Sequence, residues 1–215
     1  MVKIAPSILA ANLLKIENEV VSVDNAGAEY IHIDVMDGHY VPNISFGSNI
    51  VKTLRPITKK VLDVHLMISP VLPYIQEFIN AGADIISFHP EADNNPRQII
   101  KMIESAGCKT GIAIHPSLEI EKITKFLDEI DLVVVMTVMP GFGGQKFLYD
   151  QLSKIKKLQE LRQSMKANFE IEIDGGINQQ TSKVCSDNGA DVLVAGSYIF
   201  GSLETEYEQL INAIR

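Results

Sequence analysis

The chain has 215 residues, of which 46% are hydrophobic and 21% charged, and its 19 Lys and Arg against 27 Asp and Glu leave a formal net charge of -8. A surface this acidic repels phosphate backbones, so we expect no nucleic-acid partner. No apolar run approaches the roughly 20 residues needed to cross a bilayer, so we expect no membrane partner. The length and composition predict one globular domain spanning residues 1–215.

Neither the N-terminus nor the cysteines indicate export. Residues 1–10 form a short apolar segment, but Pro6 interrupts it and a helical pattern follows at once, unlike a signal peptide. Cys108 and Cys185 show no CxxC spacing, and we interpret them as small packing residues. Unpaired cysteines fit a reducing compartment, so we expect a cytoplasmic protein.

Strand and helix patterns alternate along the whole chain. Strands are predicted at residues 3–9, 30–36, 60–66, 85–89, 110–114, 132–136, 169–173 and 192–195. Helices are predicted from Asn12 to 25, at 48–54, from Pro70 to 81, from Pro96, from Leu118, at 146–166, from Asn178 to 188, and after the last strand. Several strands are almost unbroken runs of Val and Ile, as in parallel strands buried on both faces. Eight βα units predict an α/β fold, a single (β/α)8 TIM barrel, with a doubly wound open sheet as the alternative.

The second strand carries a pair of chemically active side chains. His32 and Asp34 are two residues apart, so on a strand both project from one face, while Ile31, Ile33 and Val35 occupy the other. An imidazole beside a carboxylate is suited to bind a metal, or to act as a base with the group that orients it. An edge strand with one solvated face is the alternative interpretation.

Two further side chains join this pair in a barrel, because the C-terminal ends of all eight strands meet at one mouth. His65 lies at the C-terminal end of the third strand, and Asp174 directly follows the seventh strand. Two histidines and two carboxylates form a mixed nitrogen and oxygen ligand set for one divalent metal ion, Zn, Fe(II), Mn or Co, among which the sequence does not choose. His89 and His115 each precede a proline and are expected to face loops, outside this set.

Glycine-rich turns follow the last three strands, at 140–146, 174–176 and 196–197. Glycine lets backbone N–H groups approach an anion closely, and phosphate sites are frequent after the last strands of this barrel. The first turn is predicted to open a helix at Lys146, which we interpret as a surface charge. None of the turns is a GxxxxGK[ST] loop, so the sequence indicates a phosphorylated small molecule rather than a nucleoside triphosphate.

Six segments of the chain together resemble the ribulose-phosphate 3-epimerase family. They are IAPSIL (4–9), HIDVMDGHYVPN (32–43), HLM (65–67), PGFGGQKF (140–147), DGGI (174–177) and VAGS (194–197). The resemblance covers nearly the whole chain. It implies a metal-dependent barrel enzyme that interconverts D-ribulose 5-phosphate and D-xylulose 5-phosphate in the pentose phosphate pathway.

The resemblance also implies roles for individual residues. The metal ligands are His32, Asp34, His65 and Asp174, and the acid/base pair is Asp34 and Asp174. The implied substrate contacts are Ser7, His65, Gly141, Phe142, Gly143, Gly144, Asp174, Gly175, Gly176, Gly196 and Ser197, and Met36, Met67 and Met139 are expected to line the pocket. A homo-oligomer is expected on the same ground.

Three other functions remain as alternatives at this point. The first is a 3-epimerase of a hexulose 6-phosphate such as D-allulose 6-phosphate, which needs the same machinery. The second is a metal-free lyase or decarboxylase that uses only the phosphate site, against which the four metal-competent residues argue. The third is a sugar-phosphate binding protein without catalysis, which the presence of Asp34 and Asp174 disfavours.

Overall fold

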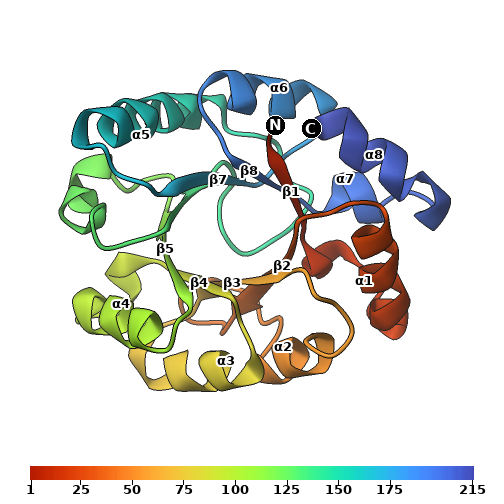
Figure 1. Cartoon of the computed structure of the whole chain (residues 1–215), viewed down its shortest axis with the longest axis horizontal. Helices are drawn as coiled ribbons and strands as arrows, with labels where there is room; N and C mark the ends of the chain where they lie inside the picture. The colour runs from red at the N-terminus through yellow and green to blue at the C-terminus, as the bar shows by residue number, and fades with distance from the viewer.

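Short strands rich in Val and Ile alternate with helices and pair in parallel around one axis (Figure 1). The computed structural model describes residues 1–215. The strands are β1 (Lys3–Pro6), β2 (Tyr30–Met36), β3 (Val61–Met67), β4 (Ile85–Phe88), β5 (Lys109–Ile114), β6 (Leu132–Met136), β7 (Glu170–Asp174) and β8 (Val192–Ala195). Their spatial order, β1-β8-β7-β6-β5-β4-β3-β2, makes sequential strands neighbours. The fold is therefore the predicted (β/α)8 barrel and not a doubly wound sheet.

The barrel closes between β1 and β2, the two ends of this strand order. The backbone N–H of Glu29 donates to the carbonyl of Ile4 at 3.1 Å, and Ser7 pairs with His32 in an isolated parallel bridge. This seam brings Ser7, the residue after β1, beside the polar side chains of β2.

The helices form an outer ring around the strands (Figure 1). They are α1 (Ile16–Asn25), α2 (Ser48–Leu54), α3 (Ile75–Ala81), α4 (Pro96–Ser105), α5 (Leu152–Met165), α6 (Gln179–Asp187), α7 (Ser197–Phe200) and α8 (Tyr207–Ile214). The bounds of α2 and β8 are those predicted from the sequence. None of the helices has the length and apolar character that crossing a membrane requires.

Side chains alternate between two environments along each strand. On β2, Ile31 and Ile33 belong to the main hydrophobic core beneath the helices. Ala113 on β5 and Val134 on β6 belong to a second, smaller hydrophobic cluster. The buried His32 alternates with the two isoleucines, so the polar face of β2 turns away from the helices, as its spacing predicts.

Two short 3-10 turns stand where an α-helix is predicted from Leu118. They are η5 (Ile120–Lys122) and η6 (Thr124–Phe126). The buried residues Ile120, Ile123 and Phe126 recur every third position, which is the period of a 3-10 helix. The prediction of an α-helix is wrong here because apolar spacing of three fits both helix types over so short a segment.

The helix predicted to open at Lys146 begins later. It is α5, which starts at Leu152 after the turn η7 (Tyr149–Gln151). The backbone N–H of Leu148 donates to the carbonyl of Thr137 at 2.8 Å, so the preceding residues run beside the end of β6 and cannot wind into a helix. Lys146 is exposed in the loop, and the first glycine-rich turn does not open a helix.

The third helix also begins later than its sequence predicts. It is α3, which starts at Ile75 after the turn η3 (Leu72–Tyr74), and not at Pro70. Asp93, from the loop after β4, accepts hydrogen bonds from the backbone N–H groups of Val71 and Leu72 at 3.0 and 2.9 Å. These bonds from another part of the chain shape the turn before the helix.

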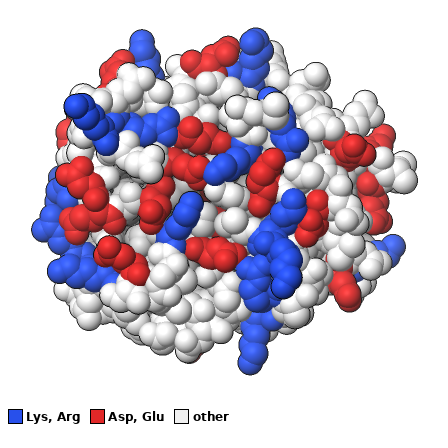
Figure 2. Space-filling model, viewed as in Figure 1, with Lys and Arg blue, Asp and Glu red and all other residues white.

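Acidic and basic side chains are interspersed on the face of the barrel seen in Figure 1 (Figure 2). Several charges are paired across elements, as in the ion pairs of Lys3 with Glu170, Arg162 with Asp191, and Arg215 with Glu29.

Candidate active site and metal centre

Strand register brings the four predicted metal-competent side chains together. The pairing of β2 with β3 sets Asp34 opposite His65, and β7 ends in Asp174. One ligand atom from each of His32, Asp34, His65 and Asp174 lies within 4.8 Å of the others, and all four residues are buried. Residues from three strands, about 140 positions apart in sequence, thus form one cluster.

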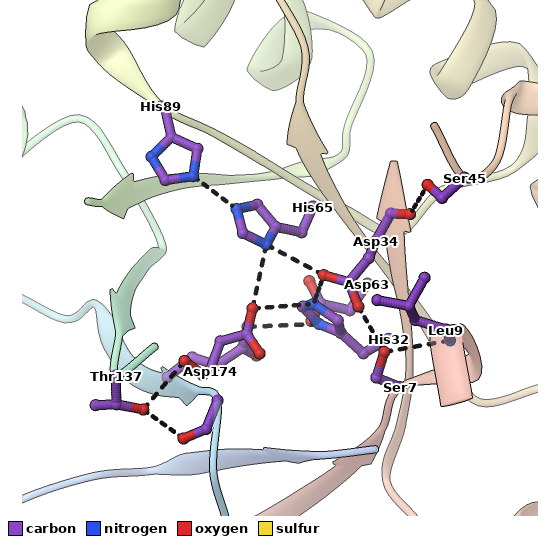
Figure 3. Close-up of polar contacts among 12 residues, drawn as sticks. Ser7, Leu9, His32, Asp34, Ser45, Asp63, His65, His89, Thr137 and Asp174 are labelled. Carbon is purple, nitrogen blue, oxygen red and sulfur yellow. Dashed lines mark hydrogen bonds and ion pairs between the residues drawn. The ribbon is translucent and has the colours of Figure 1, made fainter. Parts of the chain in front are cut away.

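The ring nitrogens and carboxylate oxygens of the cluster face one another (Figure 3). His32 Nε2 lies 3.5 Å from Asp34 Oδ1 and 3.8 Å from Asp174 Oδ2. His65 Nδ1 lies 3.6 and 3.4 Å from the same two oxygens. Ligands held about 2.1 Å from a tetrahedral cation are about 3.4 Å apart, so this spacing fits a single ion.

Two buried nitrogens in the cluster lack hydrogen-bond partners. They are His32 Nε2 and His65 Nδ1, on side chains that are fully buried. An unpaired buried polar atom is costly and is rare in folded proteins. Coordination of a cation between the carboxylates would satisfy both nitrogens, and the mixed nitrogen and oxygen set suits Zn, Fe(II), Mn or Co.

The charges of the cluster stabilise one another. Burial alone would lower the pKa of His32 and of His65, but nearby aspartates outweigh it, and both pKa values are raised. Burial alone would raise the pKa of Asp34, but His32 and His65 hold it well below its usual range. The cluster therefore favours positive charge at its centre, whether carried by imidazolium protons or by a metal ion.

A second group of buried acids, not predicted from the sequence, lies behind His32. Asp63 Oδ2 lies 2.6 Å from His32 Nδ1, and Glu172 Oε1 lies 3.6 Å from the same nitrogen. Asp63 thus holds the ring so that Nε2 faces Asp34 and Asp174. Asp63 and Glu172 each stand two residues before a predicted ligand on the same strand, and this period of two was the signal that could have found them.

His89 is not loop-facing, and that prediction is wrong. The side chain is fully buried at the end of β4, with Nε2 3.1 Å from His65 Nε2 (Figure 3). Burial lowers the pKa of His89 well below its usual value, and charge on His65 and His115 lowers it further. His89 is therefore neutral and contacts the ring edge of His65 that faces away from the carboxylates.

The two aspartates are held by different neighbours. The Ser7 hydroxyl donates to Asp34 Oδ2 at 2.5 Å, and the Ser45 hydroxyl donates to the backbone carbonyl of Asp34 at 2.5 Å. The Thr137 hydroxyl donates to the backbone carbonyl of Asp174 at 3.0 Å. Hydroxyl groups from the segments that follow β1, β2 and β6 thus orient both strand ends (Figure 3).

A cavity of about 610 Å³, counting the open space at its mouth, adjoins the cluster. Asp34 and Asp174 form part of its wall, with exposed fractions of 5% and 8%. Nine other predicted substrate contacts also line it: Ser7, Gly141, Phe142, Gly143, Gly144, Gly175, Gly176, Gly196 and Ser197. The carboxylates and the glycine-rich turns therefore line one and the same cavity.

Two predicted positions do not line this cavity. Met139 is half exposed and lies in the loop after β6, whereas Met136 and Val138 line the cavity there. His65 is fully buried behind the carboxylates and is also absent from the wall. Met36 and Met67 do line the cavity, as expected.

The turn after β7 requires glycine at two positions. Gly175 and Gly176 have φ of +117° and +68°, a backbone region that other residues rarely adopt. A Cβ on Gly175 would overlap the side chain of Val138, and one on Gly176 would lie 2.8 Å from the backbone of Phe147. The turn therefore borders the cavity with bare backbone, the kind of surface that approaches a phosphate closely.

Loops after β2 and β6 meet beside the cavity. The Asn43 side chain donates to the carbonyl of Gly141 at 2.8 Å, and the Cα of Gly141 faces Val41. In Figure 1 the loop between β6 and α5 curves across the middle of the barrel. These two segments are candidate lids over the site.

Fold and site define a class: a (β/α)8 barrel with a metal-competent His and Asp cluster beside a glycine-lined cavity at the carboxyl ends of its strands. The model of the ribulose-phosphate 3 epimerase family matches residues 3–200. The chain belongs to this family.

Named relatives are similar over the whole chain. A ribulose-phosphate 3-epimerase of Bacillus subtilis is 44% identical over 100% of this chain and 99% of its own length. One of Rhodobacter capsulatus is 45% identical over 100% of this chain and 94% of its own. A chloroplastic ribulose-5-phosphate-3-epimerase of Arabidopsis thaliana is 41% identical over 99% of this chain and 75% of its own.

Solved structures of lower identity share the fold. KGPDC from Streptococcus mutans has a TM-score of 0.73 at 18% identity and covers 100% of this chain and 95% of its own. The 3-keto-L-gulonate-6-phosphate decarboxylase from Vibrio cholerae has a TM-score of 0.73 at 18% identity and covers 100% and 95%. At such identity these neighbours support the barrel and not a shared reaction.

Proposed function

We propose that this chain is a metal-dependent ribulose-phosphate 3-epimerase, which interconverts D-ribulose 5-phosphate and D-xylulose 5-phosphate in the pentose phosphate pathway. The observation that carries the proposal is the buried cluster of His32, Asp34, His65 and Asp174 in a chain of the epimerase family. Full-length relatives at 41–45% identity bear that name, which favours it over a hexulose 6-phosphate epimerase.

The reaction needs a stabilised negative charge. A proton must leave one face of C3 and another must arrive on the opposite face, but a C–H beside a ketone is a very weak acid. Charge that develops on the sugar oxygens therefore has to be compensated in the site. A divalent cation held by the four clustered residues would supply that compensation as a Lewis acid.

Asp34 and Asp174 act as the acid/base pair in this proposal. They come from β2 and β7, with β1 and β8 between them, and both reach the same cavity. One carboxylate takes the proton from C3, and the other group returns a proton to the far face of the planar cis-2,3-enediolate. The roles exchange with the direction of the reaction. Ser7 holds Asp34 Oδ2 in a fixed orientation by donating to it.

The glycine-rich turns are proposed to bind the phosphate. Gly175, Gly176, Gly196 and Ser197 line the same cavity as the two aspartates. A phosphate ester carries about 1.5 to 2 negative charges at neutral pH, and close backbone N–H groups are suited to bind it. Binding at this end would hold C3 beside the carboxylates.

An assay that couples formation of xylulose 5-phosphate to a detectable reaction tests the proposal. We expect turnover of ribulose 5-phosphate by the metal-loaded protein, with exchange of solvent tritium into C3 of the substrate. Turnover of allulose 6-phosphate measured in parallel should be much slower. Tight sugar-phosphate binding without tritium exchange would instead identify a binding protein, and faster turnover of the hexulose would identify the other epimerase.

A cytoplasmic location and a homo-oligomeric state are parts of the same proposal. Both cysteines are free in the structure, which fits a reducing compartment. Sedimentation equilibrium of the purified protein tests the oligomeric state, and a mass equal to that of one 23.7 kDa chain would contradict it.

A further inference from the structure

His65 and His89 share one hydrogen bond on the side of His65 that faces away from the metal-competent cluster. Their Nε2 atoms lie 3.1 Å apart, and both side chains are fully buried (Figure 3). His32 has a carboxylate, Asp63, in the corresponding position, whereas His65 has a second imidazole. The two histidines of the cluster also present different nitrogens to the carboxylates, Nε2 from His32 and Nδ1 from His65.

The positions of the protons follow from this geometry. Two ring nitrogens in hydrogen-bond contact share one proton between them. Two protons would repel each other, and without a proton the two nitrogen lone pairs would repel each other. A neutral His65 whose Nδ1 lone pair faces the cluster keeps its proton on Nε2 and donates it to His89. His89 accepts at Nε2, so its own proton is on Nδ1 when the ring is neutral.

Glu91 lies near the nitrogen that carries this second proton. Its Oε1 lies 3.7 Å from His89 Nδ1, a buried atom that has no hydrogen-bond partner. The Tyr40 hydroxyl donates to the same Oε1 at 2.8 Å, and the Tyr40 ring lies 4.7 Å from the His89 ring, tilted by 31°. Tyr40 therefore holds both the carboxylate and the imidazole in place. The Glu91 side chain is 35% exposed, so the chain of contacts runs from the buried cluster to the surface.

We propose that His89 and Glu91 are positioning residues that hold His65 in the tautomer with Nε2 protonated and Nδ1 free to bind the metal. The inference rests on the proposed function, because it takes the cluster as a metal site. Neither residue lines the cavity, so neither is placed to touch the substrate. Partners that orient a metal-bound histidine typically change metal affinity by about 10- to 100-fold when they are removed.

Nuclear magnetic resonance of the zinc-loaded protein labelled with 15N-histidine tests the tautomers directly. The chain has five histidines, so a two-bond 1H–15N correlation spectrum resolves each ring. We expect His65 to carry its proton on Nε2 with Nδ1 shifted by zinc, and His89 to carry its proton on Nδ1. A His89 ring protonated on Nε2 would overturn the proposal, because His89 would then be the donor.

Zinc affinity of matched variants, measured by competition with a chromophoric chelator, tests the energetic consequence. His89→Leu removes the acceptor, and we expect about 10- to 100-fold weaker zinc binding. His89→Gln keeps a carbonyl acceptor and should recover most of the affinity. Glu91→Gln should weaken binding by less than His89→Leu, while Glu104→Gln, which removes an exposed carboxylate on α4, should leave it unchanged.

Failure of this inference is distinguishable from failure of the proposed function. A wild-type protein that binds no zinc and does not epimerise would contradict the metal site itself. Normal zinc binding and turnover in folded His89→Leu and Glu91→Gln would contradict only the positioning roles. Circular dichroism of each variant identifies loss of fold, and the tautomer spectrum of the wild type decides the question without any variant.

Discussion

Asp34 and Asp174 have the same proposed task but different surroundings. The Asp34 side chain accepts a hydrogen bond from Ser7, and the neighbouring His32 and His65 hold its pKa well below the usual range. Asp174 is held through its backbone carbonyl by Thr137. Both carboxylates face His32 and His65, but only the Asp34 side chain receives a hydrogen bond from a hydroxyl group.

Replacing either aspartate by asparagine should abolish most of the activity. Asp34→Asn and Asp174→Asn keep the side-chain volume but cannot exchange a proton, so turnover should fall by at least about 10²-fold in each. Steady-state kinetics and elemental analysis of the same samples separate lost proton transfer from lost metal. Asp128→Asn, which changes an exposed aspartate, serves as the control. A near-normal turnover in either variant removes that residue from the pair.

At the scale of elements, the start of α6 depends on a local cap. Asn178 Oδ1 accepts from the backbone N–H groups of Gln180 and Thr181 at 2.8 and 3.1 Å, and the Thr181 hydroxyl accepts from the Asn178 N–H at 2.9 Å. Asn178→Ala should lower the free energy of unfolding by about 1 kcal/mol, because two N–H groups lose their acceptor. Urea denaturation measures this. Asn178→Ser retains a capping oxygen, and an equal loss in both variants would show that the cap is not the cause.

The turn before α3 should make a pH-dependent contribution to stability. Burial alone would raise the pKa of Asp93, but the backbone N–H groups of Leu72, Asn95 and Val71 outweigh it and lower this pKa below its ordinary value. The folded state therefore binds fewer protons here than the unfolded state. The contribution is present above pH ~3.9, the usual aspartate value, and is lost as pH falls through the lower folded pKa.

Urea midpoints of the wild type and Asp93→Asn, measured from pH 6 down to pH 2, test this expectation. The wild type should be the more stable at pH 6, and the difference should shrink as Asp93 becomes protonated. A difference that stays constant over the whole range would show that the carboxylate charge contributes nothing and that the variant differs for another reason.

On the scale of the whole molecule, one metal ion would link strands from separate parts of the barrel. The four candidate ligands come from β2, β3 and β7. A ligand that binds only the folded state stabilises it by about 2.7 kcal/mol at a concentration 100 times its dissociation constant. Prolonged chelation should therefore lower the unfolding temperature and abolish turnover, and added zinc, manganese or cobalt should restore both.

Calorimetry before and after chelation, with elemental analysis, measures the effect. His39→Asn is a suitable control, because His39 is exposed and lies outside the cluster, so this variant should keep the metal-dependent increase. An active wild-type protein that contains no metal would contradict the proposed mechanism.

The sequence by itself determined the eight strands, seven of the helical regions that follow them, and the four clustered side chains. Runs of Val and Ile mark buried parallel strands, and a period of two places His32 and Asp34 on one strand face, because both signals arise from local backbone geometry. Local chemistry likewise predicted the cap at Asn178 and the extent of α2.

Only the tertiary structure decided what depends on contacts between distant segments. The delayed starts of α3 and α5 follow from hydrogen bonds that join Val71 to Asp93 and Leu148 to Thr137. The burial of His89 against His65, and of Asp63 behind His32, follows from strand packing. A sequence pattern predicts from which face of a strand a side chain projects. Strand register and closure of the barrel determine which neighbouring side chain it contacts there.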